Sequence, residues 1–380
     1  MALTVAVWMT TGVGVYLYLS SHRSTFSPIA NEPDEANQKA SDSPLSHLPG
    51  TMYLVQHGTL YRLQHGTFTV VLRSPDGAAG WTQPAFSPQG DSLVVVRRDY
   101  AYSDLYLIDR AGKVQGQLTH NASAAVELNH WAFYPRPSPD GASILFSYDP
   151  KDRFNDYNVV FAVWSLPTNG SFDQAEKWTL PEHFTGGDVQ PVPLPSGAVL
   201  YTKYAFDGKS SRILGQIYLT TRAGAVGQAL TPPEDDCSQP AVSPDGQRLA
   251  MICTRGKQFA GIEIAPFDGS KLGARQLLVA DQLAAQPTWA PDGNSLVYLA
   301  PQDTGGHFQL WQQQVAAPSR PTVVPTPLST RPATPPPGVT VGRPTVTPTL
   351  AVPTPAPLPQ PVRLTSELDF DPTSTIAWHV

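Results

Sequence analysis

The sequence predicts an all-β protein, a six-bladed β-propeller of four-stranded antiparallel blades, and three observations lead to this prediction. A heptapeptide pattern, Pro-x-x-x-Pro-x-Gly, recurs five times, and short β-branched and aromatic runs bounded by Pro, Gly and Asp follow its copies. The glycines of the copies, Gly90, Gly141, Gly197, Gly246 and Gly293, are 51, 56, 49 and 47 residues apart. A period of about 40–50 residues is typical of propellers and repeat arrays.

The heptapeptide is interpreted as the turn between the first two strands of a blade. Its copies span residues 84–90, 135–141, 191–197, 240–246 and 287–293, and three of them end in Pro-Asp-Gly. Proline presets φ for a turn, and glycine tolerates the positive φ that a tight hairpin requires. Each copy therefore predicts a hairpin, with the remaining strands of its blade downstream.

The predicted third strands give the blade count. They are residues 59–63, 104–108, 159–165, 216–220, 261–265 and 308–312, which makes six third strands for five heptapeptides. The N-terminal unit has runs at 52–56, 59–63 and 68–72 but no first strand of its own. We therefore expect six blades, the first of them incomplete at its N-terminal side.

The missing strand is predicted at the C-terminal end. Residues 370–378 resemble residues 86–90 and the strand that follows them. A C-terminal strand that completes the N-terminal sheet closes the ring and removes exposed sheet edges. An alternative left open by the sequence is that this stretch pairs as the second strand of the blade.

These repeats resemble those of TolB-type six-bladed β-propellers. The resemblance rests on the Pro-Asp-Gly turns, on Leu-Tyr-x-x-Asp in a third strand at residues 105–109 and on Leu-Thr at 118–119, and it extends over 51–315 and 362–380. The third unit departs from the pattern with a long excursion at 149–158, and the turn of the fourth lacks Ser and Asp. The resemblance implies a module that docks protein partners of the cell envelope, but it transfers no contact residue.

Two segments flank the predicted propeller at its N-terminal side. Residues 1–21 contain no charged side chain, and 2–19 are long enough to span a bilayer. We expect an uncleaved membrane anchor or signal-anchor helix, or a signal that starts further upstream; a buried core helix is the alternative. Residues 22–50 are polar and aperiodic, which predicts a disordered linker, and the propeller domain is expected over 51–316 and 362–380.

A Pro/Thr-rich tract at 317–361 is predicted to be a disordered loop inserted in the last blade. It separates a third strand at 309–312 from a fourth strand at 362–365, a place where the other blades have only a turn. Such composition favours extended polyproline II, and loop closure costs little more as a loop lengthens. The tract is interpreted as a spacer, or alternatively as a ligand for a wall component or a proline-binding partner.

The two cysteines of the chain, Cys237 and Cys253, each lie eight residues from Asp245 at the centre of a predicted turn. In a regular hairpin they face each other, with Cα atoms about 4.5–5.5 Å apart, which is within disulfide range. We predict a disulfide and an oxidising compartment; two packed thiols, or a bulge that breaks the symmetry, are the alternatives.

The sequence shows no catalytic constellation, and we assign no catalytic, cofactor-binding or metal-binding residue. Gly-x-Ser-x-Gly and His-Glu-x-x-His are both absent. His57 and His65 flank one short strand at opposite ends, so they are interpreted as equivalent turn residues that cannot share an ion. Two acidic groups, Asp149, Asp152 and Asp156, and Glu234, Asp235 and Asp236, are interpreted as solvated loop charges rather than calcium ligands.

The functional hypothesis is a membrane-anchored propeller outside the cytoplasm, periplasmic or extracellular, that binds or scaffolds envelope proteins without catalysis or cofactor. A net charge of −6 without a basic cluster argues against nucleic-acid binding. The loops at 149–158 and 317–361 are the expected working surface, and the recurring aromatics Phe86, Trp131, Trp289 and Trp378 are expected in the core between blades. Two alternatives remain, an enzyme with its site in the central channel and an accessory propeller of a separate peptidase.

Overall fold

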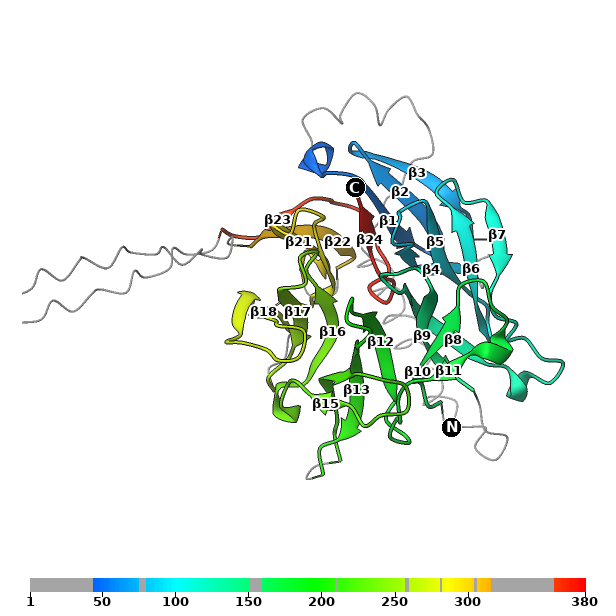
Figure 1. Cartoon of the computed structure of the whole chain (residues 1–380). Helices are drawn as coiled ribbons and strands as arrows, with labels where there is room; N and C mark the ends of the chain where they lie inside the picture. Colours follow the sequence, from blue (N-terminus) through cyan, green and yellow to red (C-terminus); the bar gives the residue numbers. More distant parts are fainter. Residues whose placement is uncertain are drawn as a thin grey trace, which may run out of the picture.

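Six four-stranded antiparallel sheets surround a central axis in the computed structural model (Figure 1). The structure describes residues 44–74, 80–150, 159–208, 211–256, 260–280, 282–303, 306–315 and 359–380. The predicted fold class, an all-β propeller with six blades of four strands, is confirmed. The predicted anchor at 1–21 and the excursion at 151–158 lie outside the described residues.

Each blade runs from an innermost strand at the axis to an outermost strand at the rim. Blade 1 is β24 (Ala377–His379), β1 (Thr51–Gln56), β2 (Thr59–Gln64) and β3 (Thr67–Leu72). Blade 2 is β4 (Gly80–Phe86), β5 (Ser92–Arg98), β6 (Ser103–Asp109) and β7 (Val114–Gln117). Blade 3 is β8 (Trp131–Pro137), β9 (Ser143–Asp149), β10 (Ala162–Pro167) and β11 (Glu176–Lys177).

Blade 4 is β12 (Asp188–Pro193), β13 (Val199–Phe206), β14 (Ile213–Thr220) and β15 (Gln228–Ala229). Blade 5 is β16 (Cys237–Val242), β17 (Arg248–Cys253), β18 (Gly261–Pro266) and β19 (Gln276–Val279). Blade 6 is β20 (Ala285–Trp289), β21 (Ser295–Pro301), β22 (Phe308–Gln314) and β23 (Val362–Arg363). Short 3-10 turns lie at η2 (Pro44–His47), η3 (Val126–Leu128), η4 (Phe172–Gln174) and η5 (Pro233–Asp235).

The heptapeptide forms the predicted hairpin turn between the first two strands of blades 2 to 6. In blade 5 the Gly246 amide donates to the Ser243 carbonyl at 2.8 Å, and Gly246 has a φ of 72°, which glycine adopts without steric cost. The Asp245 carboxylate accepts hydrogen bonds from the Ser243 hydroxyl and the Gln247 amide. Local turn chemistry thus fixes the hairpin before any contact between blades is made.

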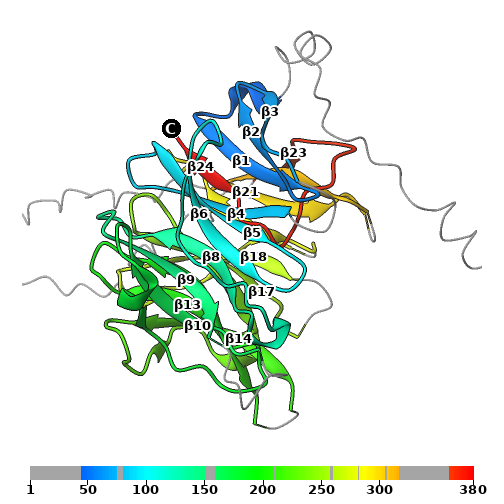
Figure 2. The same ribbon diagram turned by 90° about the vertical axis from the view of Figure 1, so that its right-hand side faces the viewer.

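The C-terminal strand closes the ring in blade 1. β24 pairs antiparallel with β1, with Met52 opposite Trp378, and both views place the red C-terminal strand beside the blue β1 (Figures 1 and 2). The C-terminal stretch is therefore the first strand of the blade, and the alternative pairing as its second strand is wrong. The Thr375 hydroxyl also donates to the Pro84 carbonyl of blade 2 at 2.9 Å, which joins the two blades at the seam.

The core lies between neighbouring blades rather than within them. Between blades 2 and 3, for example, Val94 and Val96 pack with Phe146 and Leu166, and all four are at most 2% exposed. Both faces of each blade are apolar around its middle strands, so an isolated blade would expose apolar side chains to water. This explains why the fold needs the full ring.

The boundaries of the two appendages differ from the sequence prediction where the structure describes them. Residues 44–50 of the expected linker are packed, since Leu45 and Leu48 are each 9% exposed and lie in one cluster with Met52. The fourth strand of blade 6 pairs as predicted, with Gln312 opposite Val362, so the tract joins strands three and four. Residues 317–358 of the tract lie outside the described residues, and within the described part no helix is long and apolar enough to cross a membrane.

Candidate functional site

Five of the innermost strands bulge at the same point, one residue before the first proline of the heptapeptide. The bulge residues are Gln83, Tyr134, Gln190, Gln239 and Gln286, and their φ values lie between 51° and 57°. The sheet register shifts there in each of these blades. Because proline has no N–H to continue the ladder, the strand turns away from its sheet and directs the bulge residue elsewhere.

The bulge residues bind one another from blade to blade around the axis. The Gln83 side-chain carbonyl accepts the Tyr134 amide at 2.7 Å, Gln190 accepts the Gln239 amide at 3.1 Å, and Gln239 accepts the Gln286 amide at 2.6 Å. Each bond satisfies a backbone N–H that the bulge has released from its own sheet. We call this ring of hydrogen bonds the glutamine belt.

Hydroxyl and carbonyl groups complete the glutamine belt where glutamine is absent. Tyr134 has no side-chain carbonyl, and in its blade the Ser147 hydroxyl accepts the backbone N–H of Gln190 at 3.1 Å instead. At the seam the Gln286 side-chain amide donates to the Pro372 carbonyl at 3.0 Å, while the Ser374 hydroxyl accepts the Gln83 amide at 2.8 Å. All six blades are therefore linked at one level of the channel, which narrows there to a cavity of about 20 Å³.

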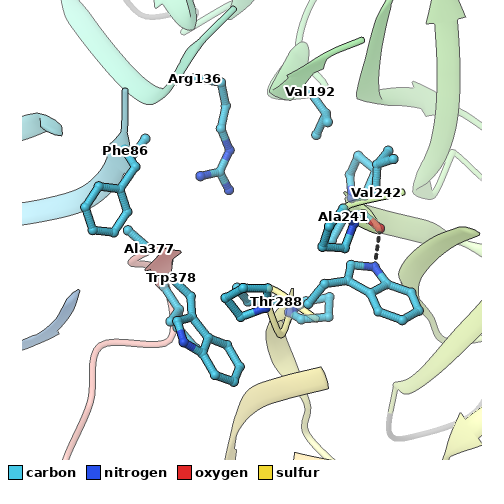
Figure 3. A pocket seen from close by; sticks show the side chains of 15 residues that line it. Phe86, Arg136, Val192, Ala241, Val242, Thr288, Ala377 and Trp378 are labelled. Carbon is cyan, nitrogen blue, oxygen red and sulfur yellow. Dashed lines mark hydrogen bonds between the residues drawn. The ribbon is translucent and has the colours of Figure 1, made fainter. Parts of the chain in front are cut away.

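A larger cavity of about 280 Å³ lies on the turn side of the glutamine belt, and we call it the channel cavity. The innermost strands of all six blades contribute to its wall. The wall is made of proline, aliphatic and aromatic side chains, among them Phe86, Trp289 and Trp378, together with Thr288 and one charged residue, Arg136 (Figure 3). The channel cavity is thus a mostly apolar site with a single cation.

The Arg136 guanidinium points into the channel cavity (Figure 3). Among the described residues, none makes a hydrogen bond or an ion pair with it, and no acidic residue lines the cavity. Burial lowers the pKa of Arg136 to about 10, because desolvation disfavours the charged form. The group still carries its charge at neutral pH, so an unpaired cation faces an apolar space.

A second cavity, of about 340 Å³, lies on the other side of the glutamine belt, and we call it the mouth pocket. Trp81, Phe133, Arg98 and the 87% exposed Tyr100 line it, with the carboxylates of Asp99 and Asp371. Aromatic and arginine side chains of this kind are enriched at the centres of protein–protein interfaces. The two ends of the channel therefore differ in chemistry.

The comparisons with known proteins agree with this architecture. No protein-family model matches the sequence. The chain is 27% identical over 166 residues to the protein TolB homolog of Chlorobium chlorochromatii (strain CaD3), covering 44% of this chain and 32% of that relative. The solved TolB of Acinetobacter baumannii superposes with a TM-score of 0.52 at 18% identity, over 70% of this chain and 61% of that one. The fold is a TolB-like six-bladed β-propeller.

The reach of this similarity is limited in sequence and in length. A putative TolB from Agrobacterium tumefaciens gives a TM-score of 0.49 at 18% identity, over 70% of this chain and 85% of that chain. The chain spans about a third of the length of the curated relative that it matches. The relationship therefore establishes the propeller, and the role of this TolB-like propeller has to be argued from its own residues.

The two histidines that occupy equivalent positions in the sequence, His57 and His65, lie apart in the structure. His57 and His65 each precede a glycine in a tight turn, with φ values of 48° and 50°, at opposite ends of β2, which confirms their equivalent turn positions. His57 lies near the Asp369 carboxylate at 3.5 Å, and His307 binds the same carboxylate at 3.0 Å. Among the described residues no group of three or more His, Cys, Asp or Glu is arranged to hold a metal ion.

In the acidic group before β16, Glu234 is exposed, in line with its interpretation as a solvated loop charge, whereas that interpretation is wrong for the buried Asp235. Asp235 is 7% exposed and forms ion pairs with Arg255 and Arg275, and the same two arginines hold the buried Glu263. The neighbouring Asp236 carboxylate accepts a backbone amide of β14 at 2.7 Å, which ties blade 5 to blade 4. The carboxylates of Asp235 and Asp236 therefore anchor the loop.

The other acidic group has one described member, Asp149, at the end of β9. Asp149 is 2% exposed, so its interpretation as a solvated loop charge is also wrong. Asp152 and Asp156 lie outside the described residues.

Cys237 and Cys253 form a disulfide that joins β16 to β17, with an S–S distance of 2.09 Å and directly opposed Cα positions. The register near the turn, Val242 opposite Leu249, would place Cys237 opposite Thr254 if it continued unchanged. The bulge after Ser238 shifts the register by one residue and brings the two cysteines together. The bulge therefore makes the pairing, whereas the sequence suggested that a bulge would break it.

Three of the recurring aromatic residues, Phe86, Trp289 and Trp378, serve the core and the channel at once. Trp131, in contrast, is partly exposed and stacks on Phe133 outside the core clusters of the described residues. Trp289 is 6% exposed and belongs to the cluster between blades 5 and 6, as predicted, yet its ring also forms the cavity wall beside Phe86 and Trp378. The channel residues, Arg136 and the belt glutamines, were not predicted from the sequence. A signal was present, because glutamine precedes the first proline of the heptapeptide in four of the five copies.

Proposed function

We propose that this TolB-like propeller is a protein-binding module of the cell envelope, and that a partner docks at the mouth pocket. The observation that carries the proposal is the composition of this pocket, where the exposed Tyr100 stands beside Arg98 and a tryptophan wall. Fully exposed large aromatic side chains next to a concave site are the residues that anchor protein interfaces. The resemblance to TolB supports the same role.

The rigidity of the ring supports a binding site that does not have to fold when the partner docks. The glutamine belt and the β24–β1 pairing fix the innermost strands, so the mouth pocket is preformed. A preformed site loses less conformational entropy on binding than a mobile one. The residues of the mouth pocket come from blades 1, 2 and 3, so the docking surface that we propose would extend over three blades.

We further propose that the module is non-catalytic. Among the described residues, Asp104 and Asp188 are buried carboxylates whose pKa is raised by desolvation, and neither lines the channel cavity. Asp104 accepts hydrogen bonds from Thr119 and the Asn121 amide, and Asp188 is paired with Lys203 at 3.2 Å. Hydrogen bonds and an ion pair of this kind stabilise loops and blade contacts, in contrast to the converging acid and base of a channel enzyme.

A membrane anchor and a location outside the cytoplasm complete the proposal. The uncharged segment 1–21 supports an anchor, and the Cys237–Cys253 disulfide supports an oxidising compartment. In spheroplasts of the source organism, we expect an externally added protease to cleave the propeller and alkaline extraction to leave the protein in the membrane. Release by alkali would refute the anchor, and protection from protease would refute the location.

Site-specific photo-cross-linking tests the docking surface. A benzophenone amino acid placed at residue 100 in cells of the source organism should give a discrete protein adduct. The same probe at the equally exposed residue 226 in blade 4 is the matched control. Arg98→Ala should weaken the adduct at 100, because arginine contributes strongly to such interfaces. Equal adducts at 100 and 226, or no adduct at either, would overturn the proposal.

A further inference from the structure

We propose that the channel cavity binds a small organic monoanion, a carboxylate on a flat apolar body, with its carboxylate on Arg136. This site lies on the other side of the glutamine belt from the mouth pocket and does not depend on the proposed protein docking. Two observations lead to it, an unpaired guanidinium aimed into a cavity and a wall that is otherwise apolar. A cavity of about 280 Å³ is close to the lower limit of small-ligand sites.

The guanidinium is the one side-chain donor of the cavity wall that the described protein leaves without an acceptor. The Trp289 indole N–H donates to the Ala241 carbonyl at 2.9 Å (Figure 3). The Trp378 indole N–H donates to the Pro49 carbonyl at 2.7 Å. The Thr288 hydroxyl donates to the carbonyl of the belt residue two positions before it, at 3.1 Å. Arg136 is partly exposed to the cavity, so its N–H groups are open to an acceptor from outside the chain, and a carboxylate that displaces water there gains a charge-assisted hydrogen bond.

The single positive charge of the cavity wall favours a ligand that carries a single negative charge. Arg136 is the one ionisable residue in the wall that the described residues form, and removing charges from water is costly unless each is paired. A second carboxylate in the same cavity would have no cation to pair with. Guanidinium and carboxylate match in a planar, two-bond geometry, which favours a carboxylate over a bulkier anion.

The walls select the body of the ligand. Phe86 and Trp378 lie on one side of the guanidinium, and Val192 and Val242 lie on the other (Figure 3). Trp289 also lines the cavity. Flat aromatic rings stack or pack edge-on against such aromatic and aliphatic side chains. An aromatic or compact aliphatic carboxylic acid fits both the charge and the surface.

Isothermal titration of the purified propeller with 2-naphthoate tests the proposal. We expect saturable binding with one site per chain, and at least tenfold weaker binding of the neutral 2-naphthalenemethanol and of the dianion naphthalene-2,6-dicarboxylate. Arg136→Met should weaken 2-naphthoate roughly tenfold to a hundredfold, the range for a hydrogen bond to a charged group. Arg136→Lys keeps the charge and should lose less. Arg98→Met is the matched control and should change the affinity less than about twofold, because Arg98 lies beyond the glutamine belt.

Three results would overturn the proposal. They are absence of saturable binding to the wild-type protein, equal binding by a folded Arg136→Met variant, and equal affinity for the neutral alcohol. Circular dichroism and the thermal midpoint establish whether each variant is folded, and Arg136→Lys keeps the test decisive if Arg136→Met is not.

Discussion

Gln239→Met should destabilise the propeller although it leaves the apolar core intact. The Gln239 side-chain carbonyl accepts the Gln286 amide at 2.6 Å, and Gln286 is 7% exposed. Methionine has nearly the same length but no carbonyl, so the substitution leaves a buried N–H without its acceptor. A buried donor without a partner costs about 1–3 kcal/mol.

The surroundings of Gln239 narrow this range. The waist of the channel has a cavity of about 20 Å³, which is room for about one water molecule, and a water can bind the released N–H. We therefore expect the free energy of unfolding to fall by about 1–2 kcal/mol. For domains of 150–250 residues, 1 kcal/mol corresponds to about 2–4 °C in the thermal midpoint, so the midpoint should fall by about 2–8 °C.

Differential scanning calorimetry measures this change, with Gln276→Met as the matched control. Gln276 is exposed on β19, so its substitution should change the free energy of unfolding by less than about 0.5 kcal/mol. Hydrogen exchange gives a local readout, since the Gln286 amide should exchange faster in Gln239→Met than in the wild-type protein. Equal midpoints for the two variants, with an unchanged exchange rate at Gln286, would refute the belt as a stabilising feature.

Three further predictions concern the turn, the disulfide and the seam. Turn hydrogen bonds, above all from the Ser243 hydroxyl, hold the pKa of the Asp245 carboxyl below its usual value. The ionised carboxylate of Asp245 therefore stabilises the folded protein at pH values above the unfolded pKa, and this stabilisation is lost as the pH falls through the lower, folded pKa. Asp245→Asn should thus flatten the loss of stability on acidification below about pH 4, as followed by urea unfolding. The double substitution of Cys237 and Cys253 by Ala should lower the free energy of unfolding by about 3 kcal/mol, the value for a loop of about 15 residues, and an unchanged midpoint in urea would contradict it. Deletion of residues 376–380 removes β24 and exposes β1, so cooperative thermal unfolding should be lost; a truncated protein with the wild-type transition would show that closure is dispensable.

The fold could be predicted from the sequence because the residues that form its turns act locally. Proline and glycine restrict the backbone wherever they stand, so the five heptapeptides reported the hairpins without any knowledge of the ring. To predict how the ring closes, it was enough to see that the N-terminal blade lacks one strand and that the C-terminal end of the chain supplies one. The Cys237–Cys253 pair shows the limit of such reasoning, because the mirror symmetry about Asp245 pointed to the correct pair while the actual register depends on a bulge.

The channel residues were not accessible in the same way, because their role exists only when six strands converge. Gln83 and Gln286 are 203 residues apart (286 − 83), yet each meets the closing segment at residues 372–374. Arg136 stands at the second position of its heptapeptide, which Ala, Val or Thr occupies in the other copies, and its sequence context gives no sign of the space that it faces. Convergence is a property of the closed ring, and one sequence does not display it.

The position of the glutamine belt makes the two proposed sites separable. The belt lies between the mouth pocket and the channel cavity, since Gln83 follows the pocket residue Trp81 and precedes the cavity residue Phe86 on the same strand. Between them the belt residues line a cavity of only about 20 Å³, which is room for about one water molecule. A docked protein at Tyr100 should therefore leave the affinity for 2-naphthoate unchanged unless the belt itself moves. Coupling between the two sites would identify the belt as a two-state element, because binding at one site changes affinity at the other only through a shared change of conformation.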